Sequence, residues 1–497
     1  MRNRHFATTD DEFGAVPFPI RLYAVVDHLE AGVTSNLVAF DCVDADWLDG
    51  VLRDPYFDSD EPTHTKELWE KLWKRTAASP SPIDDMPVYR LELDLASLGQ
   101  FADPYASLSI ANDSELATIE ATWISLNVFA NYVPHSDEGD LYHSMFLAPR
   151  RVHVKARAPS REAVATLELI TDLSHLPLAD GPLLERLVDK TAAAEHLAVF
   201  NVGQGGANGL LNASHQVSLY YDLGCGVYRN AWSKPVPLQF CWTLPNSAIV
   251  LSHWDADHWA GAQVPHPNPP PSAPSLPALS RDWIVPVQKI GPVHLAFANS
   301  IAPGHLWKFT SSSSHLIAGG RRLTLELAKG ASRNHSGIVL LAEKITFGSS
   351  WLLSGDCDYK YFASALAPSH VVALTAPHHG ASLANGSLPP TAPSRTYQRV
   401  VYSFGINNSH GKSSISHPTT AGVMSHDTVG WRHGAVWPTA TNPGVTPPAT
   451  DALATSVHTA GITRSVPPTT WLGGVLVGWS PPTSASSCSC YPLLSQF

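Results

Sequence analysis

Four side chains that can bind a metal ion lie within six residues, in the segment His253-Trp-Asp255-Ala-Asp257-His258. Their imidazole nitrogens and carboxylate oxygens suit Zn²⁺, Mn²⁺ or iron. The segment follows the apolar start of a strand predicted at 247–261. On a loop, alternating positions point to one side while the adjacent Asp257 and His258 diverge, so one short segment can serve two neighbouring cations. The sequence therefore predicts a metal site on this loop.

Further ligand candidates stand at the ends of later predicted strands. A strand-end aspartate is usually a turn former, and a single histidine is more often a core or solvated residue. Four strand ends that all present metal-binding side chains favour a common site over either of these interpretations. The later candidates are Asp356 in SWLLSGD, His378 and His379 in TAPHHG, and His417 in SISHP.

The strands that must position these residues have β-branched and apolar character. A proline-rich interruption at 264–280 is incompatible with a helix or a central strand, so it is expected as a surface loop beside the site. After about residue 430 the chain is rich in Pro, Thr and Ser, with one candidate edge strand at 470–479. The other predicted strands lie at 196–211, 217–224, 322–328, 336–343, 350–358, 370–380 and 399–408.

The first third of the chain contains no catalytic grouping of His, Cys or carboxylates, so a binding or assembly module is expected there. Ser160 is a predicted N-cap of the helical stretch that follows. In this first region strands are predicted at 20–28, 87–95, 122–133 and 143–148, and a helix at 66–75. The predicted organisation is a β-rich domain (1–158), a helical connector (159–195), a hydrolase domain (196–430) and a C-terminal extension (431–497).

Composition restricts the classes of partner. The 497 residues carry a formal net charge of −11, which argues against broad, charge-driven binding to nucleic acid or to an anionic membrane. No apolar run is long enough for a transmembrane helix, and no signal-peptide pattern follows the start. Six sparse cysteines favour reduced thiols, so a cytoplasmic location without membrane contact is expected.

From about 196 to 425 the chain resembles the metallo-β-lactamase superfamily. It is most similar to the hydrolase domain of competence-type DNA-internalisation proteins. The shared motifs occur in the same order as VGQGGAN, YYDLG, HWDADH, SGD, APHHGA and NNSHGKSSISHP. Two departures are Gly206, where that subgroup usually has Asp, and the longer stretch between Asn408 and His417.

The resemblance implies an α/β fold, namely an αββα metallo-β-lactamase sandwich, here with the additional β-rich N-terminal domain. It implies one or two divalent ions, Zn²⁺ or Mn²⁺, with Asp356 bridging and with Asp255 favouring the harder Mn²⁺. Asp257, His379 and His417 are the candidate catalytic residues. His305, His315 and His335 remain open as a third histidine of the first site. The implied metal ligands are His253, Asp255, Asp257, His258, Asp356 and His378.

Two such cations lower the pKa of a water between them and stabilise the attacking and leaving oxygens. The leading hypothesis is a metal-dependent phosphodiesterase or nuclease, with nucleic acid or a nucleotide as substrate. Lys412 and His410 are candidate stabilisers of developing charge. Two basic runs are candidate phosphate-binding rims: Arg150, Arg151, Lys155, Arg157 and Arg161, and then Arg321, Arg322, Lys329 and Arg333.

Two alternatives stay open. The first is hydrolysis of a carbonyl substrate such as a thioester, lactone or lactam, which the acidic net charge permits. The second is a partner-binding or regulatory protein with a silent hydrolase domain, whose N-terminal region binds another protein. The nearly complete ligand set argues against a silent site.

Overall fold

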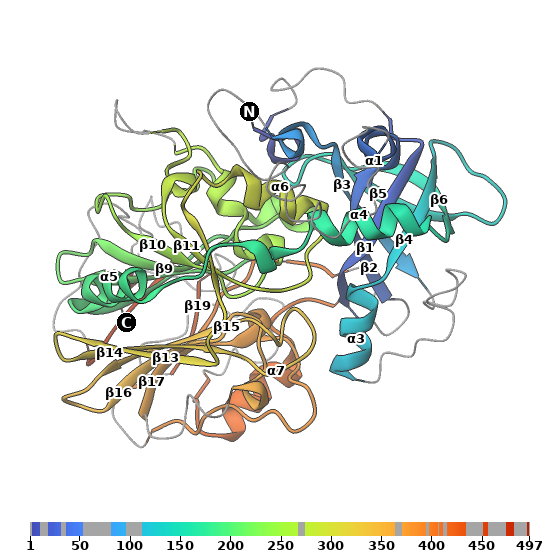
Figure 1. The fold of residues 1–497 in the computed structure, drawn as a ribbon. Coiled ribbons are helices and arrows are strands. Elements are labelled where there is room, and N and C mark those ends of the chain that lie inside the picture. Colours follow the sequence, from blue (N-terminus) through green and yellow to red (C-terminus); the bar gives the residue numbers. More distant parts are fainter. Residues whose placement is uncertain are drawn as a thin grey trace.

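Three β-sheets form the framework of the chain in the computed structural model (Figure 1). One closes into a barrel, and the other two are open sheets that pack on each other. The structure describes residues 2–9, 18–30, 36–52, 81–95, 112–266, 274–362, 370–393, 397–405, 407–410, 415–433, 451–455, 474–481 and 495–496.

The N-terminal region forms a closed barrel of six strands in the order β1-β2-β3-β5-β6-β4. Its interior is an apolar cluster to which Leu22, Phe40 and Leu126 contribute. Alternate residues of β1, such as Tyr23 and Val25, instead pack outward into the core that the barrel shares with the rest of the chain. The strands are β1 (Arg21–Glu30), β2 (Asn36–Asp44), β3 (Val88–Leu95), β4 (Trp123–Phe129), β5 (Asp137–Tyr142) and β6 (Arg150–Arg157).

The second sheet has eight strands in the order β12-β11-β10-β9-β8-β7-β20-β21. Strands β9 to β12 are parallel, so their carboxyl ends lie at one edge of the sheet. The loop with residues 253–258, called the metal loop below, begins at this edge shortly after β10. The strands are β7 (Ala194–Phe200), β8 (Ala207–Asn212), β9 (Val217–Leu223), β10 (Ala248–Val250), β11 (Trp283–Pro286), β12 (Leu306–Phe309), β20 (Gly474–Gly478) and β21 (Ser495–Gln496).

The third sheet has seven strands in the order β13 to β19. Its inner face packs against the inner face of the eight-stranded sheet, where Tyr221, Val250, Leu340 and Trp351 share one buried cluster. The strands are β13 (Ser313–Ala318), β14 (Arg321–Leu327), β15 (Ile338–Lys344), β16 (Ser349–Leu353), β17 (His370–Thr375), β18 (Arg399–Tyr402) and β19 (Ala452–Ala454).

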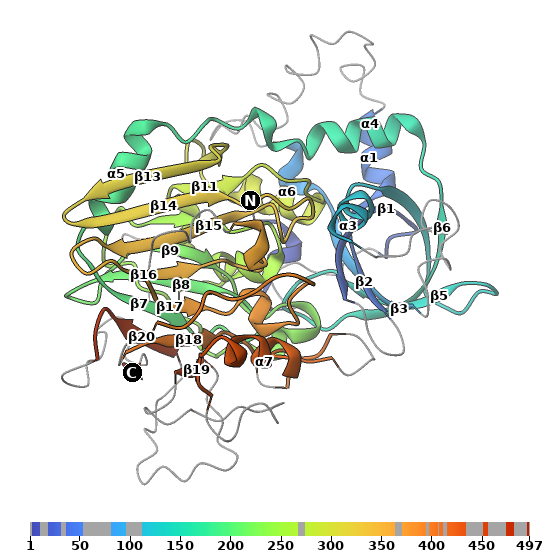
Figure 2. The ribbon, with the colours of Figure 1, turned by 90° about the horizontal axis from the view of Figure 1, so that it is seen from below.

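Helices are few and short in the described residues. Helix α5 lies at the edge where both sheets meet, α6 contacts barrel strands β2 and β3, and α7 packs on the outer face of the seven-stranded sheet. Figure 2 shows α4 running beside the barrel toward the open sheets. The helices are α1 (Ala45–Leu52), α3 (Asp113–Glu120), α4 (Arg161–Ile170), α5 (Gly181–Thr191), α6 (Pro292–Ser300) and α7 (Thr420–Thr428).

The predicted αββα sandwich is wrong, because the chain is a β-rich assembly with a closed barrel. In the described residues only short helices, such as α6 after β11 and α7 after β18, lie outside the open sheets, and the connection between β9 and β10 contains only loops and a 3-10 turn. The proline-rich stretch at 264–280 lies partly outside the described residues. Its described end contains a 3-10 turn, Pro277–Ser280.

Most predicted strands are present, and the helical stretch after residue 159 contains α4 and α5, with Ser160 capping α4 through the Ala163 N–H. The predicted strand at 143–148 is a turn, and β5 ends just before it. Segment 470–479 contains β20, which lies between β7 and β21 and is therefore not at the edge. The predicted helix at 66–75 lies outside the described residues.

Two further properties concern chemistry and environment. Within the described part of the chain, no helix has both the length and the apolar character to cross a bilayer. Cys42, Cys225 and Cys357 are free and buried, whereas Cys241 is disulfide-bonded. The expectation of reduced thiols throughout is therefore wrong for Cys241.

The barrel is attached to the open sheets beside the metal loop. The carboxylate of Asp41 on β2 accepts the backbone N–H of Val293 at 2.7 Å, at the start of α6. A carboxylate at a helix N-terminus satisfies a free N–H and is favoured by the helix dipole. In addition, Asn299 at the other end of α6 donates to Asp84 at 2.8 Å. Both contacts fix the side of the barrel that faces the site.

Replacing Trp351 should test the shared core of the two open sheets. Trp351 is fully buried and stacks on Trp479 with ring centroids 3.5 Å apart. Trp351→Ala should lower the free energy of unfolding by about 3–5 kcal/mol, since it leaves a large cavity. Phe347→Ala, at a ring that is 61% exposed beside the same sheet, should cost less than about 0.5 kcal/mol. Equal losses in denaturant titrations of both variants would contradict the packing described.

Candidate metal centre

The metal loop is held against two glycines from neighbouring turns. Gly206 donates its backbone N–H to the carbonyl oxygen of Asp257 at 3.0 Å. A Cβ at Gly224 would lie 1.6 Å from that same oxygen, so only glycine permits this approach. A side chain at Gly206 would in turn begin 2.9 Å from His258 Nδ1. The two glycines thus allow the loop to bury His253 and His258.

The first group of candidate ligands consists of His253, His258 and Asp356, all buried. His258 Nε2 lies 3.1 Å from one oxygen of Asp356, and His253 Nε2 lies 3.8 Å from the other. Neither Nε2 atom has a hydrogen-bond partner among the described residues. Both imidazoles therefore face the same carboxylate, and His258 lies within ion-pair distance of it.

The other nitrogens of these two imidazoles are already engaged. His258 Nδ1 donates to Asp222 at 2.9 Å, and Ser252 Oγ donates to the same carboxylate at 2.8 Å. Because the Ser252 hydroxyl proton is used there, its oxygen accepts from His253 Nδ1 at 2.9 Å. Hydrogen bonds of this kind fix the tautomer of metal-binding histidines and leave Nε2 free to bind the ion. Asp222 stands in the motif YYDLG, but its orienting role was not predicted from that motif.

The second group consists of Asp257, His258 and His379. His379 Nε2 lies 3.1 Å from Asp257, while its Nδ1 donates to the carbonyl oxygen of Ser403 at 2.8 Å. His378 and His379 both have left-handed backbones, with φ of 48° and 54°. Such conformations are uncommon outside glycine and concentrate at functional sites. Here they direct two consecutive imidazoles to the site, and His378 Nε2 lies 3.8 Å from Asp356.

Asp255 differs from the other loop carboxylate because a buried arginine already pairs with it. Arg333 Nε donates to one oxygen of Asp255 at 2.7 Å, and the other oxygen lies 3.5 Å from His253 Nε2. Burial alone would raise the pKa of Asp255, but Arg333 and His253 hold it well below the ordinary range. One oxygen of Asp255 is therefore still directed to the site.

The imidazoles and carboxylates of the cluster shift one another's ionisation. Burial lowers the pKa of His258, but Asp356, Asp222 and Asp257 outweigh burial and raise it well above the ordinary value. Burial similarly opposes ionisation of Asp356, yet His258, His378 and His379 hold its pKa well below the usual range. Between these imidazoles and carboxylates there must be either protons or metal ions, and the donor set fits Zn²⁺ or Mn²⁺.

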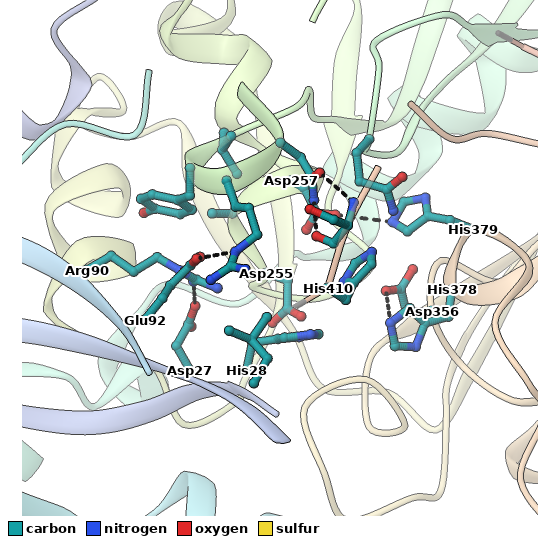
Figure 3. Close-up of a pocket in the computed structure, with 18 residues that line it drawn as sticks. Asp27, His28, Arg90, Glu92, Asp255, Asp257, Asp356, His378, His379 and His410 are labelled. Carbon is teal, nitrogen blue, oxygen red and sulfur yellow. Dashed lines mark hydrogen bonds and ion pairs between the residues drawn. The ribbon is translucent and has the colours of Figure 1, made fainter. Parts of the chain in front are cut away.

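Five of these residues line a pocket between the barrel and the open sheets, namely Asp255, Asp257, Asp356, His378 and His379 (Figure 3). Asp27, His28, Arg90 and Glu92 extend into it from barrel strands β1 and β3. None of these four residues was predicted from the sequence to belong to the site. One feature of the sequence could have pointed to them: these polar side chains interrupt the otherwise apolar strand sequences AVVDHLE and VYRLELDL.

Several residues that the sequence suggested for the site lie elsewhere. His417 contacts the His378 ring and lies near Glu30, and it is in neither ligand group of the metal loop. The three candidate third histidines are also engaged elsewhere: His305 pairs with Asp282, His315 contacts Thr324, and His335 pairs with Asp113. Lys412 lies outside the described residues.

The two basic runs do not line the pocket. The first lies largely on β6, on the side of the barrel away from the open sheets in both ribbon views (Figures 1 and 2). In the second run, Arg321 pairs with Glu195 and Arg322 with Glu343. Arg333 is buried against Asp255 and Asp27. The expectation of a basic phosphate-binding rim at the pocket is therefore wrong for these residues.

Removing Arg333 should destabilise the junction between barrel and site. Its guanidinium is 4% exposed and lies 2.9 Å from Asp27 and 2.7 Å from Asp255. Arg333→Met should cost about 3–5 kcal/mol of unfolding free energy, because buried Asp255 loses its arginine and Asp27 keeps only Arg90 and His294. The partly exposed Arg322→Met should cost less than about 1 kcal/mol. Similar losses in chemical denaturation for the two variants would argue against a structural role of Arg333.

Comparison with known proteins adds no assignment. No protein-family model matches the chain, and no curated protein matches it. Function must therefore be inferred from the site itself.

Proposed function

We propose that the protein is a metal-dependent hydrolase that cleaves phosphodiesters with one or two ions, Zn²⁺ or Mn²⁺, in the pocket. The observation that carries the proposal is the pair of buried Nε2 atoms of His253 and His258, which face Asp356 without a hydrogen bond. A buried nitrogen and a buried carboxylate are stable at this separation only if a proton or cation lies between them. The motif resemblance to metallo-β-lactamase-superfamily hydrolases supports the same interpretation.

His253, His258 and Asp356 would hold one ion, and Asp257 and His379 would hold a second ion beside it. When bound, such ions act as Lewis acids toward the substrate and lower the pKa of water toward neutrality. The hydrogen bonds from Asp222, Ser252 and Ser403 keep the imidazoles oriented, so little reorganisation is needed during the reaction.

The surroundings of the ligands bear on the substrate. Barrel residues line the pocket on one side and candidate ligands on the other, so we propose that it takes a compact group such as a nucleotide or a single-stranded end. Neither of the two basic runs lines the pocket. We therefore propose that the substrate is a small or single-stranded phosphodiester and not a duplex. The barrel contributes pocket residues, which favours a role in substrate binding over a role confined to partner proteins.

A carbonyl ester is the second candidate substrate, and one observation favours it. Both arginines of the pocket are already paired: Arg90 with Asp27 and Glu92, and Arg229 with Glu92 and Asp94. A substrate phosphate would then depend on the metal ions for charge neutralisation. An uncharged thioester or lactone would not carry this requirement.

Substitution of Asp257 and Asp356 tests the proposal. Asp257→Asn and Asp356→Asn should each lower Mn²⁺- or Zn²⁺-dependent hydrolysis of bis-p-nitrophenyl phosphate and of single-stranded DNA by more than about 100-fold. This estimate follows because residues that only support metal ligands are already worth about 10–100-fold. Asp282→Asn, at a partly buried aspartate paired with His305, is the matched control and should keep full activity.

Three outcomes separate the candidates. Loss of diesterase activity in both site variants, with the control unaffected, supports the proposal. Metal-dependent cleavage of a thioester or lactone without diesterase activity replaces it with the second candidate. Full activity in both site variants contradicts a metal centre at this position.

A further inference from the structure

A second cluster of imidazoles surrounds Glu30, at the end of barrel strand β1. His28 Nε2 lies 3.8 Å from one carboxylate oxygen of Glu30, and His417 Nε2 lies 3.8 Å from the other. The ring of His410 stacks on that of His417, with centroids 4.2 Å apart. The donor atoms of His28, Glu30 and His410 lie within 4.8 Å of one another, and those of Glu30, His378 and His417 form a second such group, so three imidazoles outside the metal centre gather at this carboxylate.

The nitrogens of these imidazoles lack hydrogen bonds among the described residues. His417 is buried, and neither of its ring nitrogens has a partner there. His410 Nε2 and His28 Nε2 are likewise buried without one. Leaving several buried nitrogens unsatisfied is costly, so native structures seldom do so without a ligand, ion or water.

The backbone holds this arrangement in place. Asn408 binds both the N–H of His417, at 2.8 Å, and its carbonyl oxygen, at 2.6 Å. The N–H of His410 donates to the carbonyl oxygen of Ile415 at 2.9 Å. His410 and His417 are thus fixed on a cross-linked loop, while Glu30 and His28 come from the barrel.

We infer that Glu30, His28, His410 and His417 form a separate metal site, the Glu30 site, which takes a zinc-class divalent ion. Three imidazoles and one carboxylate make a four-ligand set of the kind that Zn²⁺ prefers. Donor atoms around a tetrahedral zinc are roughly 3.3 Å apart, given metal–ligand distances near 2 Å. His28 and His417 each lie 3.8 Å from a different oxygen of Glu30, which is too long for a hydrogen bond and fits a carboxylate that faces the ion with both oxygens.

The Glu30 site differs from the metal centre in composition and in consequence. The metal centre is rich in carboxylates, whereas the Glu30 site is rich in imidazoles and so favours Zn²⁺ over Mn²⁺. An ion there would tie the barrel to the loop that carries His410, at the wall of the pocket. His378 lies between the two sites, with its ring 5.1 Å from that of His417 and its Nε2 3.8 Å from Asp356. The Glu30 site does not depend on the proposed activity.

Cobalt titration of the full-length chain tests the inference, since Co²⁺ reports four-coordinate sites through strong visible absorption. The Asp257→Asn/Asp356→Asn double variant should still bind one Co²⁺ with that absorption. Adding Glu30→Gln should abolish both the ion and the band, and adding His28→Gln should weaken binding about tenfold or more. Glu138→Gln, at an exposed barrel glutamate paired with Arg151, is the matched control and should change neither.

The outcomes are decisive in either direction. A double variant that binds no Co²⁺, or a Glu30→Gln variant with undiminished binding, overturns the Glu30 site. Circular dichroism identifies a variant that fails to fold. In that case anomalous diffraction from the zinc-loaded wild type decides: a peak beside Glu30 supports the site, and peaks only beside Asp356 overturn it. Loss of hydrolysis with Co²⁺ retained at Glu30 would instead count against the proposed function alone.

Discussion

Negative charge buried at the ends of strands is the constraint on which the other features depend. Asp222, Asp255 and Asp356 are each less than 10% exposed, and they surround the imidazoles of the metal loop. Withdrawing an ionised carboxylate from water costs several kcal/mol unless opposite charge compensates for it. The chain supplies one arginine, Arg333, and several histidines, and the Nε2 atoms of His253 and His258 have no hydrogen-bond partner in the described part of the chain. In the proposed metal centre a bound cation would resolve this balance, so the same residues that destabilise an empty site would hold the ion in a loaded one.

The barrel takes part in this balance. Asp27 on β1 accepts from Arg333, which in turn pairs with Asp255, so charge is compensated in a continuous series from barrel to metal loop. His294 on α6 extends the series by bonding to Asp27 at 2.6 Å. The charged groups of the barrel and those of the metal loop are both buried. A movement of the barrel relative to the open sheets would therefore leave buried charges without their partners. The pocket is therefore a composite of two regions that lie far apart in the sequence.

Local sequence predicted the metal loop because its four ligand-type residues lie within six positions. The strands that carry Asp356 and His378 were also predictable, since apolar runs there end in polar turns. Glu30 and His28 could not be recognised, because their meeting with His410 and His417 depends on how the barrel docks. The fold was not foreseen either. The resemblance suggested layers of helices outside the open sheets, whereas the described residues form only short helices there and a loop with a 3-10 turn connects β9 to β10. The position of His417 near Glu30 and His378 could not be read from the sequence for a related reason, since its distance from the metal loop is a tertiary property.

Elemental analysis of protein purified without chelators tests the central claim most directly, since it counts the ions that the buried charge requires. We expect at least one tightly bound divalent ion per chain in the wild type, and at least one fewer after Asp257→Asn/Asp356→Asn substitution. Wild-type protein that is folded and free of metal, and that takes up none from equimolar Zn²⁺ or Mn²⁺, would contradict a metal centre. The buried imidazoles and carboxylates would then be balanced by protons alone.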